Sequence, residues 1–280
     1  ADVIKGKALG VEDYLTKPVD PEELLVTIQA RLARAREIQT NAEERLDEIK
    51  GQIVNALGHE MRTPLTYISG YTELALEDIS SLSPDLLDEF LQGISMGAER
   101  LTRLANDFLI LVRLDTGQTE EEFQRLVEVR HDLNAILERT VRQYEAQASA
   151  KGITLTTQVA PNLPPVRVCQ PLLVDALGRL LDNAIKFSTE EGQAVTVRAQ
   201  ATEEWVAITV TDEGVGIPAH EIPHIFERFR QIDRKTMEQQ GVGLGLAIAQ
   251  GLIDLHGGEI EVQSTPEEGS AFTIKLPSAE

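Results

Sequence analysis

Two groups of polar residues in this sequence have types and spacings suited to chemistry. The first is His59, followed directly by Glu60 and, four residues after the histidine, by Thr63. On a helix His59 and Thr63 share one face and Glu60 lies on the neighbouring flank. A neutral imidazole beside a carboxylate is a nucleophile whose proton can be accepted, which suits attack on a phosphoryl group. The plain alternative is a surface histidine near a helix kink.

The second group is suited to a magnesium nucleotide. Asn183 and Lys186 stand three residues apart at the end of a predicted helix, and Asp212 ends a predicted strand. An Asn oxygen is a hard ligand of the kind that Mg²⁺ prefers, and a Lys ammonium can meet phosphate. The Asp carboxylate can accept a hydrogen bond from an exocyclic amine such as that of adenine. By themselves, an Asn and a Lys at a helix end are more often a solvated cap.

Glycines accompany the second group at two places. Gly214 and Gly216 follow the predicted strand, and Gly241, Gly243 and Gly245 precede a predicted helix. Glycine lets the backbone run close to a flat ligand, and the N–H groups at a helix start favour phosphate. The string GVGLGL is not a dinucleotide fingerprint, because its spacing differs and it follows a polar segment instead of a strand.

A helical hairpin, residues 39–116, is predicted to carry the histidine. Ser83 followed by Pro84 indicates a helix start, and Pro64 predicts that the first helix bends just after the histidine. We expect two such antiparallel helices to pair with a second copy in a dimeric four-helix bundle. The alternative is docking of the hairpin on the C-terminal domain of its own chain. The predicted stripe alternates steps of four and three: Leu87, Leu91, Ile94, Ala98, Leu101, Ala105, Phe108 and Val112.

The C-terminal zone, residues 123–280, predicts an α/β sandwich of the α+β class in this multidomain chain. It follows a Glu- and Gln-rich linker at about 116–124. Because strands and helices alternate and the last strands are joined by a turn, we expect a mixed sheet with helices on one face. The predicted helices are 133–151, 171–187 and 242–255, and the predicted strands are 153–159, 194–201, 205–212, 259–264 and 271–276.

Composition excludes several classes of protein. The 280 residues carry a formal net charge of -20, a field that repels nucleic-acid phosphates and anionic lipid surfaces. We therefore expect no nucleic acid as a partner. A single cysteine, Cys169, rules out an intrachain disulfide and fits a reducing compartment. Without an apolar run of about 18 residues we expect no membrane insertion and a chain that is cytoplasmic or faces the cytosol. The start at Ala1 suggests a piece of a longer protein.

The string HEMRTPL around His59 resembles the phosphoacceptor motif of sensor histidine kinases of two-component signalling. The resemblance implies that His59 is phosphorylated on its imidazole. It also implies that Glu60 serves as base or orienter, and that Thr63 helps to place water when the kinase acts in reverse as a phosphatase.

Four further motifs, in order, resemble the ATP-binding domain that histidine kinases share with gyrase and related chaperone ATPases. They are the N box around Asn183, DEGVGI, the FERF string and GVGLGL. This resemblance implies ATP and Mg²⁺, with Asn183 on the metal, Lys186 on phosphate and Asp212 on adenine, and a lid at about 231–241. The remaining implied ATP-binding residues lie in the last three motifs: Gly214, Gly216, Phe229, Gly241, Gly243, Gly245 and Leu246.

Two positions depart from the family pattern. Arg179 stands where many members have Asn, so that either the metal environment differs or the Arg touches phosphate. Cys169 stands near a position where an aspartate is common. We interpret it as a small buried apolar residue, with a redox sensor as the alternative.

The N-terminal residues 1–38 resemble the end of a response-regulator receiver domain, on the string GVEDYLTKPVDPEELL. In that resemblance Lys17 would contact a phosphorylated aspartate. The phosphoacceptor aspartate and the acidic pair of a receiver domain do not precede it, so we expect a truncated receiver and a connector helix.

Together these observations predict an ATP-dependent protein-histidine kinase. It would phosphorylate its own His59 and pass the phosphoryl group to an aspartate of a separate response-regulator receiver domain, with phosphatase activity toward that regulator as an addition. Two alternatives remain: a pseudokinase dimer that signals through bundle conformation, and an ATPase of the chaperone or gyrase type.

Overall fold

The computed structural model describes residue 55 and residues 57–77, 83–188, 193–202, 204–231 and 243–279. The chain forms two units, 1–59 and 60–280, and almost all described residues belong to the second. The receiver-like segment at 1–38, with Lys17, lies outside the described residues.

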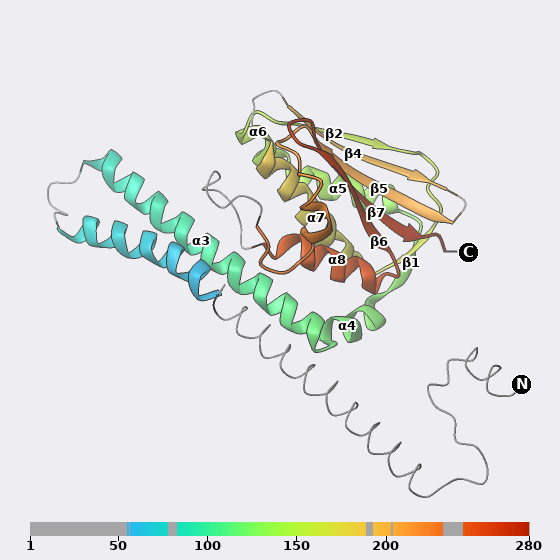
Figure 1. Cartoon of the computed structure of the whole chain (residues 1–280), viewed down its shortest axis with the longest axis horizontal. Helices are drawn as coiled ribbons and strands as arrows, with labels where there is room; N and C mark the ends of the chain where they lie inside the picture. Colours follow the sequence, from blue (N-terminus) through green and yellow to red (C-terminus); the bar gives the residue numbers. More distant parts are fainter. Residues whose placement is uncertain are drawn as a thin grey trace, which may run out of the picture. The chain divides into compact units, whose positions relative to one another are not determined.

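The predicted hairpin is present, and from Glu60 onward it belongs to the second unit (Figure 1). Its first helix is helical over 57–77 on both sides of Pro64, and its second helix is α3, Pro84–Asp115. Ser83 begins α3 as predicted, because its hydroxyl oxygen accepts a hydrogen bond from the Leu86 N–H at 3.2 Å. The proline at the first helical position removes an N–H that would otherwise lack a partner.

Two glycines allow the hairpin helices to approach closely. A Cβ on Gly93 would collide with the Tyr71 ring of the first helix. A Cβ on Gly97 would lie 2.7 Å from the Ile68 side chain and 3.1 Å from the Pro64 carbonyl oxygen. Both positions are therefore restricted to glycine by packing between the helices.

The first helix of the hairpin does not cover the predicted apolar stripe of α3. The buried residues of α3 are Phe90, Gly93, Gly97, Leu104 and Leu111, which lie on the adjacent face. Members of the predicted stripe stay exposed in the single chain, and the exposed fractions of Leu87, Leu91 and Val112 are 38%, 56% and 40%. Docking on the C-terminal domain uses the adjacent face, because Leu111 joins the core of that domain.

The predicted linker at 116–124 is wrong, because the segment forms helix α4, Gln118–Leu126. Gly117 precedes it in the left-handed conformation with φ of 75°. Thr119 and Phe123 are one turn apart and both are buried, and the Phe123 ring meets the His256 ring edge-on at 4.9 Å between centroids. The many Glu and Gln residues that suggested a solvated linker occupy the outer face of this helix.

The C-terminal domain has the predicted mixed sheet, with strand order β2-β4-β5-β7-β6. Only β2 and β4 are parallel. Strands β4 and β5 have the predicted bounds, because their alternating residues give a clear signal. At one edge, β6 exposes Glu259 and Glu261, and the Lys275 ammonium of β7 pairs with both. The strands are β2 Thr154–Val159, β4 Ala194–Ala201, β5 Trp205–Asp212, β6 Glu259–Thr265 and β7 Gly269–Pro277.

Helices cover one face of this sheet, as expected (Figure 1). They are α5 Leu133–Gln143, α6 Glu145–Ala150, α7 Gln170–Phe187 and α8 Gly245–Leu255. The predicted helix 133–151 is interrupted at Tyr144, and the helix predicted from 242 begins only at Gly245. The sequence reading also missed a two-stranded sheet of β1, Glu128–Arg130, and β3, Val166–Val168. Strands of three residues are too short to show an alternating pattern.

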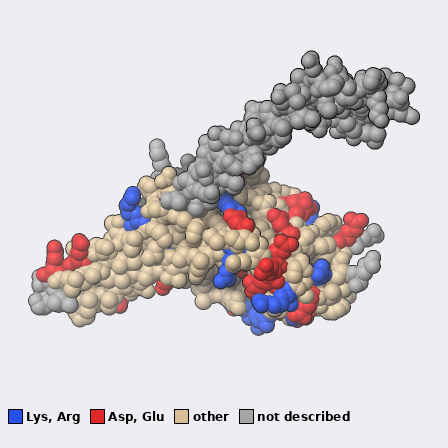
Figure 2. All heavy atoms as spheres, turned by 90° about the horizontal axis from the view of Figure 1, so that it is seen from below, with Lys and Arg blue, Asp and Glu red and all other residues tan. Residues whose placement is uncertain are grey.

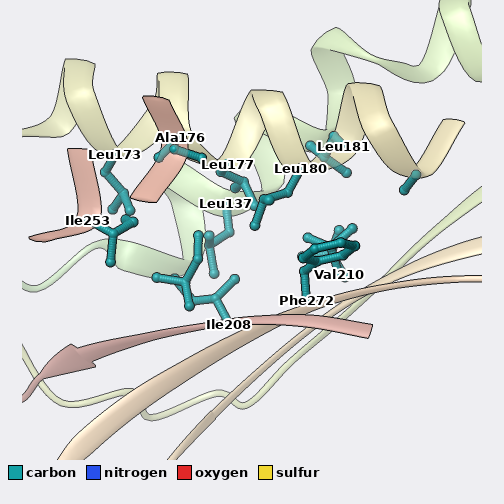
Figure 3. Packing of buried hydrophobic residues seen from close by; sticks show 14 of the residues in the cluster. Leu137, Leu173, Ala176, Leu177, Leu180, Leu181, Ile208, Val210, Ile253 and Phe272 are labelled. Atoms are coloured by element: carbon teal, nitrogen blue, oxygen red, sulfur yellow. The ribbon is translucent and has the colours of Figure 1, made fainter. Parts of the chain in front are cut away.

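The core lies between the helices and the sheet, where leucines of α7 meet side chains of β5 and β7 (Figure 3). Leu173, Leu177 and Leu181 follow the helical repeat and are fully buried. Ile208 and Phe272 face them from the sheet. This packing fixes α7, whose C-terminal end carries Asn183 and Lys186.

No helix in the described ranges has the length and apolar character needed to cross a membrane. On the face drawn in Figure 2, acidic and basic side chains lie next to one another without a broad basic area.

Candidate active site

Asp212 lies at the C-terminal end of β5 and is only 5% exposed. Its Oδ1 accepts a hydrogen bond from the Gly214 N–H at 2.9 Å. Burial raises the pKa of this carboxyl to about 6, although hydrogen bonds from the Gly214 and Ser270 backbones act in the opposite direction. A buried carboxylate that is ionised at neutral pH is a strong acceptor for an exocyclic amine.

The loop after Asp212 contains two glycines, and any larger residue at either position would force the neighbouring backbone to move. Gly216 has φ of 66°, and a Cβ there would strike the Thr265 backbone. The turn between β6 and β7 holds this loop, because Glu267 N–H donates to the Val215 carbonyl oxygen at 2.8 Å. Gly214 packs its Cα against the Phe187 carbonyl at the end of α7. The two glycines therefore let this loop pack closely against the end of α7 and against the turn between β6 and β7.

Asn183 and Lys186 lie half-buried on the last turns of α7. The loop after β5 meets this helix end, since Val215 N–H donates to the Phe187 carbonyl oxygen at 3.3 Å. Burial lowers the pKa of Lys186 to about 8, with further lowering by the neighbouring charges of Arg100, Arg103 and Lys151, whereas Asp182 raises it. Asp212, predicted to bind adenine, and Lys186, predicted to bind phosphate, thus both lie at the C-terminal end of α7.

The second glycine cluster starts α8. Gly243 has φ of 73°, and its carbonyl oxygen accepts a hydrogen bond from the Phe229 N–H at 2.9 Å. Phe229 itself has φ of 62°, an uncommon conformation for an aromatic residue. In the described part of the chain no side chain caps α8, whose first residues are Gly245 and Leu246, so its N–H groups are available to an anion. Gly241 and the predicted lid beyond Gln231 lie outside the described residues.

On the first hairpin helix, His59 is exposed and is the last residue of the first unit. Thr63, in the second unit, is exposed as well. Glu60 is buried, with 9% exposure, and its Oε2 accepts a hydrogen bond from Arg100 Nη2 of α3 at 3.3 Å. The Gln231 amide approaches the other carboxylate oxygen at 3.5 Å. Sequence reasoning missed Arg100, because only the pairing of the two helices shows that it faces Glu60.

Comparison with known families agrees with this division of the chain. Residues 49–117 match the His Kinase A (phospho-acceptor) domain. Residues 170–280 match the histidine kinase-, DNA gyrase B-, and HSP90-like ATPase family. The two matches together cover more than half of the chain, in the order found in the structure. The chain belongs to the histidine kinases.

Individual histidine kinases extend this finding. The sensor histidine kinase WalK of Bacillus subtilis is 31% identical over 245 residues, which are 85% of this chain and 38% of that protein. The structure of ShkA in complex with AMPPNP has a TM-score of 0.57 and 27% identity, and covers 81% of this chain and 46% of that chain. Histidine kinase ThkA, in complex with the response regulator TrrA, gives a TM-score of 0.61 at 23% identity, covers 85% of this chain and 64% of that chain, and shows a shared fold.

The chain spans less than half the length of the curated relatives that it matches, from 29% for the non-motile and phage-resistance protein of Caulobacter vibrioides to 47% for a sensor-like histidine kinase of Rhizobium meliloti.

Arg179, which departs from the histidine kinase pattern, is held by acidic side chains. Its Nη1 donates to Asp107 Oδ1 of α3 at 2.8 Å, and both side chains are largely buried. Its Nε is buried and lies 3.2 Å from Asp175 Oδ1, without the alignment of a hydrogen bond. The guanidinium thus ties α7 to α3.

Cys169 is fully buried at the start of α7, which agrees with its interpretation as a small apolar core residue. Its N–H donates to His256 Nε2 at 3.1 Å, and the other ring nitrogen of His256 lies 2.7 Å from the Leu252 carbonyl oxygen. This pair of contacts requires the neutral imidazole with its proton on Nδ1. Burial accordingly lowers the pKa of His256.

Proposed function

We propose that this chain transfers the γ-phosphoryl group of ATP to the imidazole of His59 and then to an aspartate of a response-regulator receiver domain. The observation that carries the proposal is the convergence of Asp212, its glycine loop and the Asn183–Lys186 end of α7 in a chain that also has the HEMRTPL helix. ThkA, which shares the fold, forms a complex with a response regulator, and this supports the receiver as partner.

In the proposed site Asp212 accepts a hydrogen bond from the adenine amine, and Gly214 and Gly216 let the ring approach the backbone. Lys186 and the open N–H groups at Gly245 and Leu246 meet phosphate oxygens. Phe229 lies beside the start of α8, where its N–H donates to the Gly243 carbonyl oxygen.

The donor set fits a magnesium ion only if the nucleotide supplies part of the coordination. Among the described residues no group of three His, Cys, Asp or Glu side chains could hold a metal. Mg²⁺ commonly keeps waters and phosphate oxygens and takes few protein ligands, so a single amide oxygen from Asn183 is compatible with it. The ion would neutralise charge on the phosphates during transfer.

Chemically, a ring nitrogen of His59 attacks the γ-phosphorus, and the bond to the bridging oxygen of ADP breaks. Glu60 orients the imidazole or accepts its proton. In the reverse, phosphatase direction Thr63 helps to place the attacking water. Most of the rate enhancement would come from positioning and charge neutralisation.

The exposed stripe of α3 supports a homodimer as the acting species. Leu87, Leu91 and Val112 expose apolar surface along one line of the helix, next to the face that the first helix covers. A second hairpin would bury this line and complete a four-helix bundle.

Incubation with γ-labelled ATP tests the proposal. We expect acid-labile, base-stable label on the protein, lost in His59→Gln and in Asn183→Ala but retained in His131→Gln, which changes an exposed histidine away from these motifs. Absence of label from a dimer that stays intact would support a pseudokinase. Phosphate release without protein label would support an ATPase of the gyrase or chaperone type, and either result would overturn the proposal.

A further inference from the structure

Helices α3 and α7 run in opposite directions where they meet. Asp107 of α3 pairs with Arg179 of α7 at 2.8 Å. Lys186 lies seven residues, or two turns, after Arg179. Seven residues before Asp107 lies Arg100, whose charge acts on Lys186. Two turns correspond to about 10.5 Å along each helix, which places Arg100 and Lys186 at a similar level on the two helices.

Arg103 occupies the same region of α3. Residues 100, 103 and 107 follow the spacing of three and four that places side chains on one helix face. Arg103 is exposed, makes no ion pair in the part of the chain that the structure describes, and also acts on Lys186. The hairpin thus carries two guanidinium groups whose charges act on the lysine at the end of α7.

This grouping of cations needs an anionic counterpart. Arg100 pairs with Glu60 at 3.3 Å, and Asp182, which also acts on Lys186, accepts a hydrogen bond from Gln147 at 2.8 Å. Lys186, Lys151, Arg100 and Arg103 carry four positive charges at this place, whereas Glu60 and Asp182 carry two negative ones, in a chain of net charge -20. A local excess of positive charge at a half-buried lysine favours a ligand with several negative charges.

We infer that Arg100 and Arg103 of α3 bind the terminal phosphate of the nucleotide, so that the hairpin distinguishes a nucleoside triphosphate from a diphosphate. The inference rests on the proposed function, which places phosphates at Lys186. An Arg fork binds phosphate oxygens through two parallel hydrogen bonds. Arg100 would then link the terminal phosphate to Glu60, the carboxylate next to the phosphoacceptor histidine.

Binding of two nucleotides to the whole chain tests this inference. Calorimetry in the presence of Mg²⁺ would measure the affinity for a non-hydrolysable ATP analogue and the affinity for ADP. Both would be measured for the unchanged chain and for Arg100→Gln/Arg103→Gln. We expect the preference for the triphosphate over ADP to fall by about tenfold or more in the double variant, because a charge-assisted contact is lost and tenfold corresponds to about 1.4 kcal/mol. ADP affinity should change by less than about threefold.

A charge-matched control separates contact from general electrostatics. Arg113→Gln/Arg125→Gln removes the same charge from exposed positions of α3 and α4, and should leave the ratio of the two affinities unchanged. The inference is overturned if the double variant at 100 and 103 keeps the original ratio, or if the control lowers the ratio equally. Should the unchanged chain bind neither nucleotide, the proposed ATP site itself would be refuted, whereas retained ADP binding with an unaltered ratio refutes only the role of α3.

Discussion

Arg228 forms a two-pronged ion pair with Asp115 at the end of α3, with Nη1–Oδ2 and Nη2–Oδ1 distances of 2.6 and 2.5 Å. Eight residues earlier on α3, Asp107 binds Arg179 in a more buried setting, where the side chains are 21% and 13% exposed. The Asp115 and Arg228 side chains are 49% and 36% exposed. The C-terminal domain therefore holds α3 at two points that differ in their access to water.

The two ion pairs should differ in strength. We expect Asp107→Asn to lower the free energy of unfolding by about 1.5–3 kcal/mol, since it leaves a largely buried guanidinium short of a charged partner. Asp115→Asn should cost about 0.2–1 kcal/mol and lose its effect at high salt, because water and ions screen that pair. Denaturant unfolding at low and high salt measures both, and the reverse ranking would contradict the burial argument.

Asp212→Asn should stabilise the fold while it abolishes adenine recognition. Because the folded pKa of Asp212 is raised to about 6, ionisation costs stability as pH rises from about 3.8 to 6, and this penalty persists above pH 6. A neutral Asn removes the cost of burying the charged carboxylate, which is about 2–3 kcal/mol. The substitution also loses one backbone hydrogen bond, which contributes about 1 kcal/mol, so the net effect is stabilising.

The melting temperature of Asp212→Asn should accordingly exceed that of the unchanged chain at pH 8, with a much smaller or reversed difference near pH 4. A gain that is equal at both pH values would show that the charge of Asp212 is not its cause. In the unchanged chain, nucleotide affinity should decline as pH falls below about 6, where Asp212 takes up its proton.

Phe123→Ala should detach α4 from the C-terminal domain. The Phe123 ring is 5% exposed and packs edge-on against His256, so its removal should cost about 3–5 kcal/mol through lost burial and a cavity. Hydrogen exchange would show faster exchange in α4 than in β5. Phe123→Leu, which keeps most of the volume, should recover a large part of the loss, and an equal loss in both variants would argue against a packing role.

Gly216→Ala and Gly245→Ala should differ in their effect on stability. Gly216 has positive φ and no room for a Cβ beside the Thr265 backbone, so alanine should lower the melting temperature and disturb the loop after β5. At Gly245, by contrast, a Cβ would meet no atom within 4 Å, and alanine favours a helix start. We expect an unchanged or higher melting temperature there. Equal destabilisation would contradict the steric argument.

The elements that could be predicted from the sequence are those with a long, regular pattern. Strands β4 and β5 have eight residues each with clear alternation, and Ser83 marks the start of α3 by a local hydrogen bond. The position of Asp212 at the end of a strand was also predictable, because its motif is continuous in sequence and directly follows the β5 pattern.

The parts that could not be predicted depend on partners distant in sequence. Helix α4 was not predicted, because its acidic composition resembles that of a linker. The contact that holds it, between the Phe123 and His256 rings, joins residues far apart in the sequence. The contacts of Arg100 with Glu60 and of Arg179 with Asp107 join residues 40 and 72 positions apart. Such pairings follow from tertiary packing, on which a local pattern carries no information.

The edge strand β6 carries charged side chains that affect how two copies of this domain can associate. An edge strand offers unpaired backbone groups to other chains, and ionic side chains along such a strand oppose strand addition and aggregation. With Glu259 and Glu261 bound by Lys275 at this edge, a second β6 would bring like charges together. Addition of a second copy of the sheet through β6 is thereby discouraged.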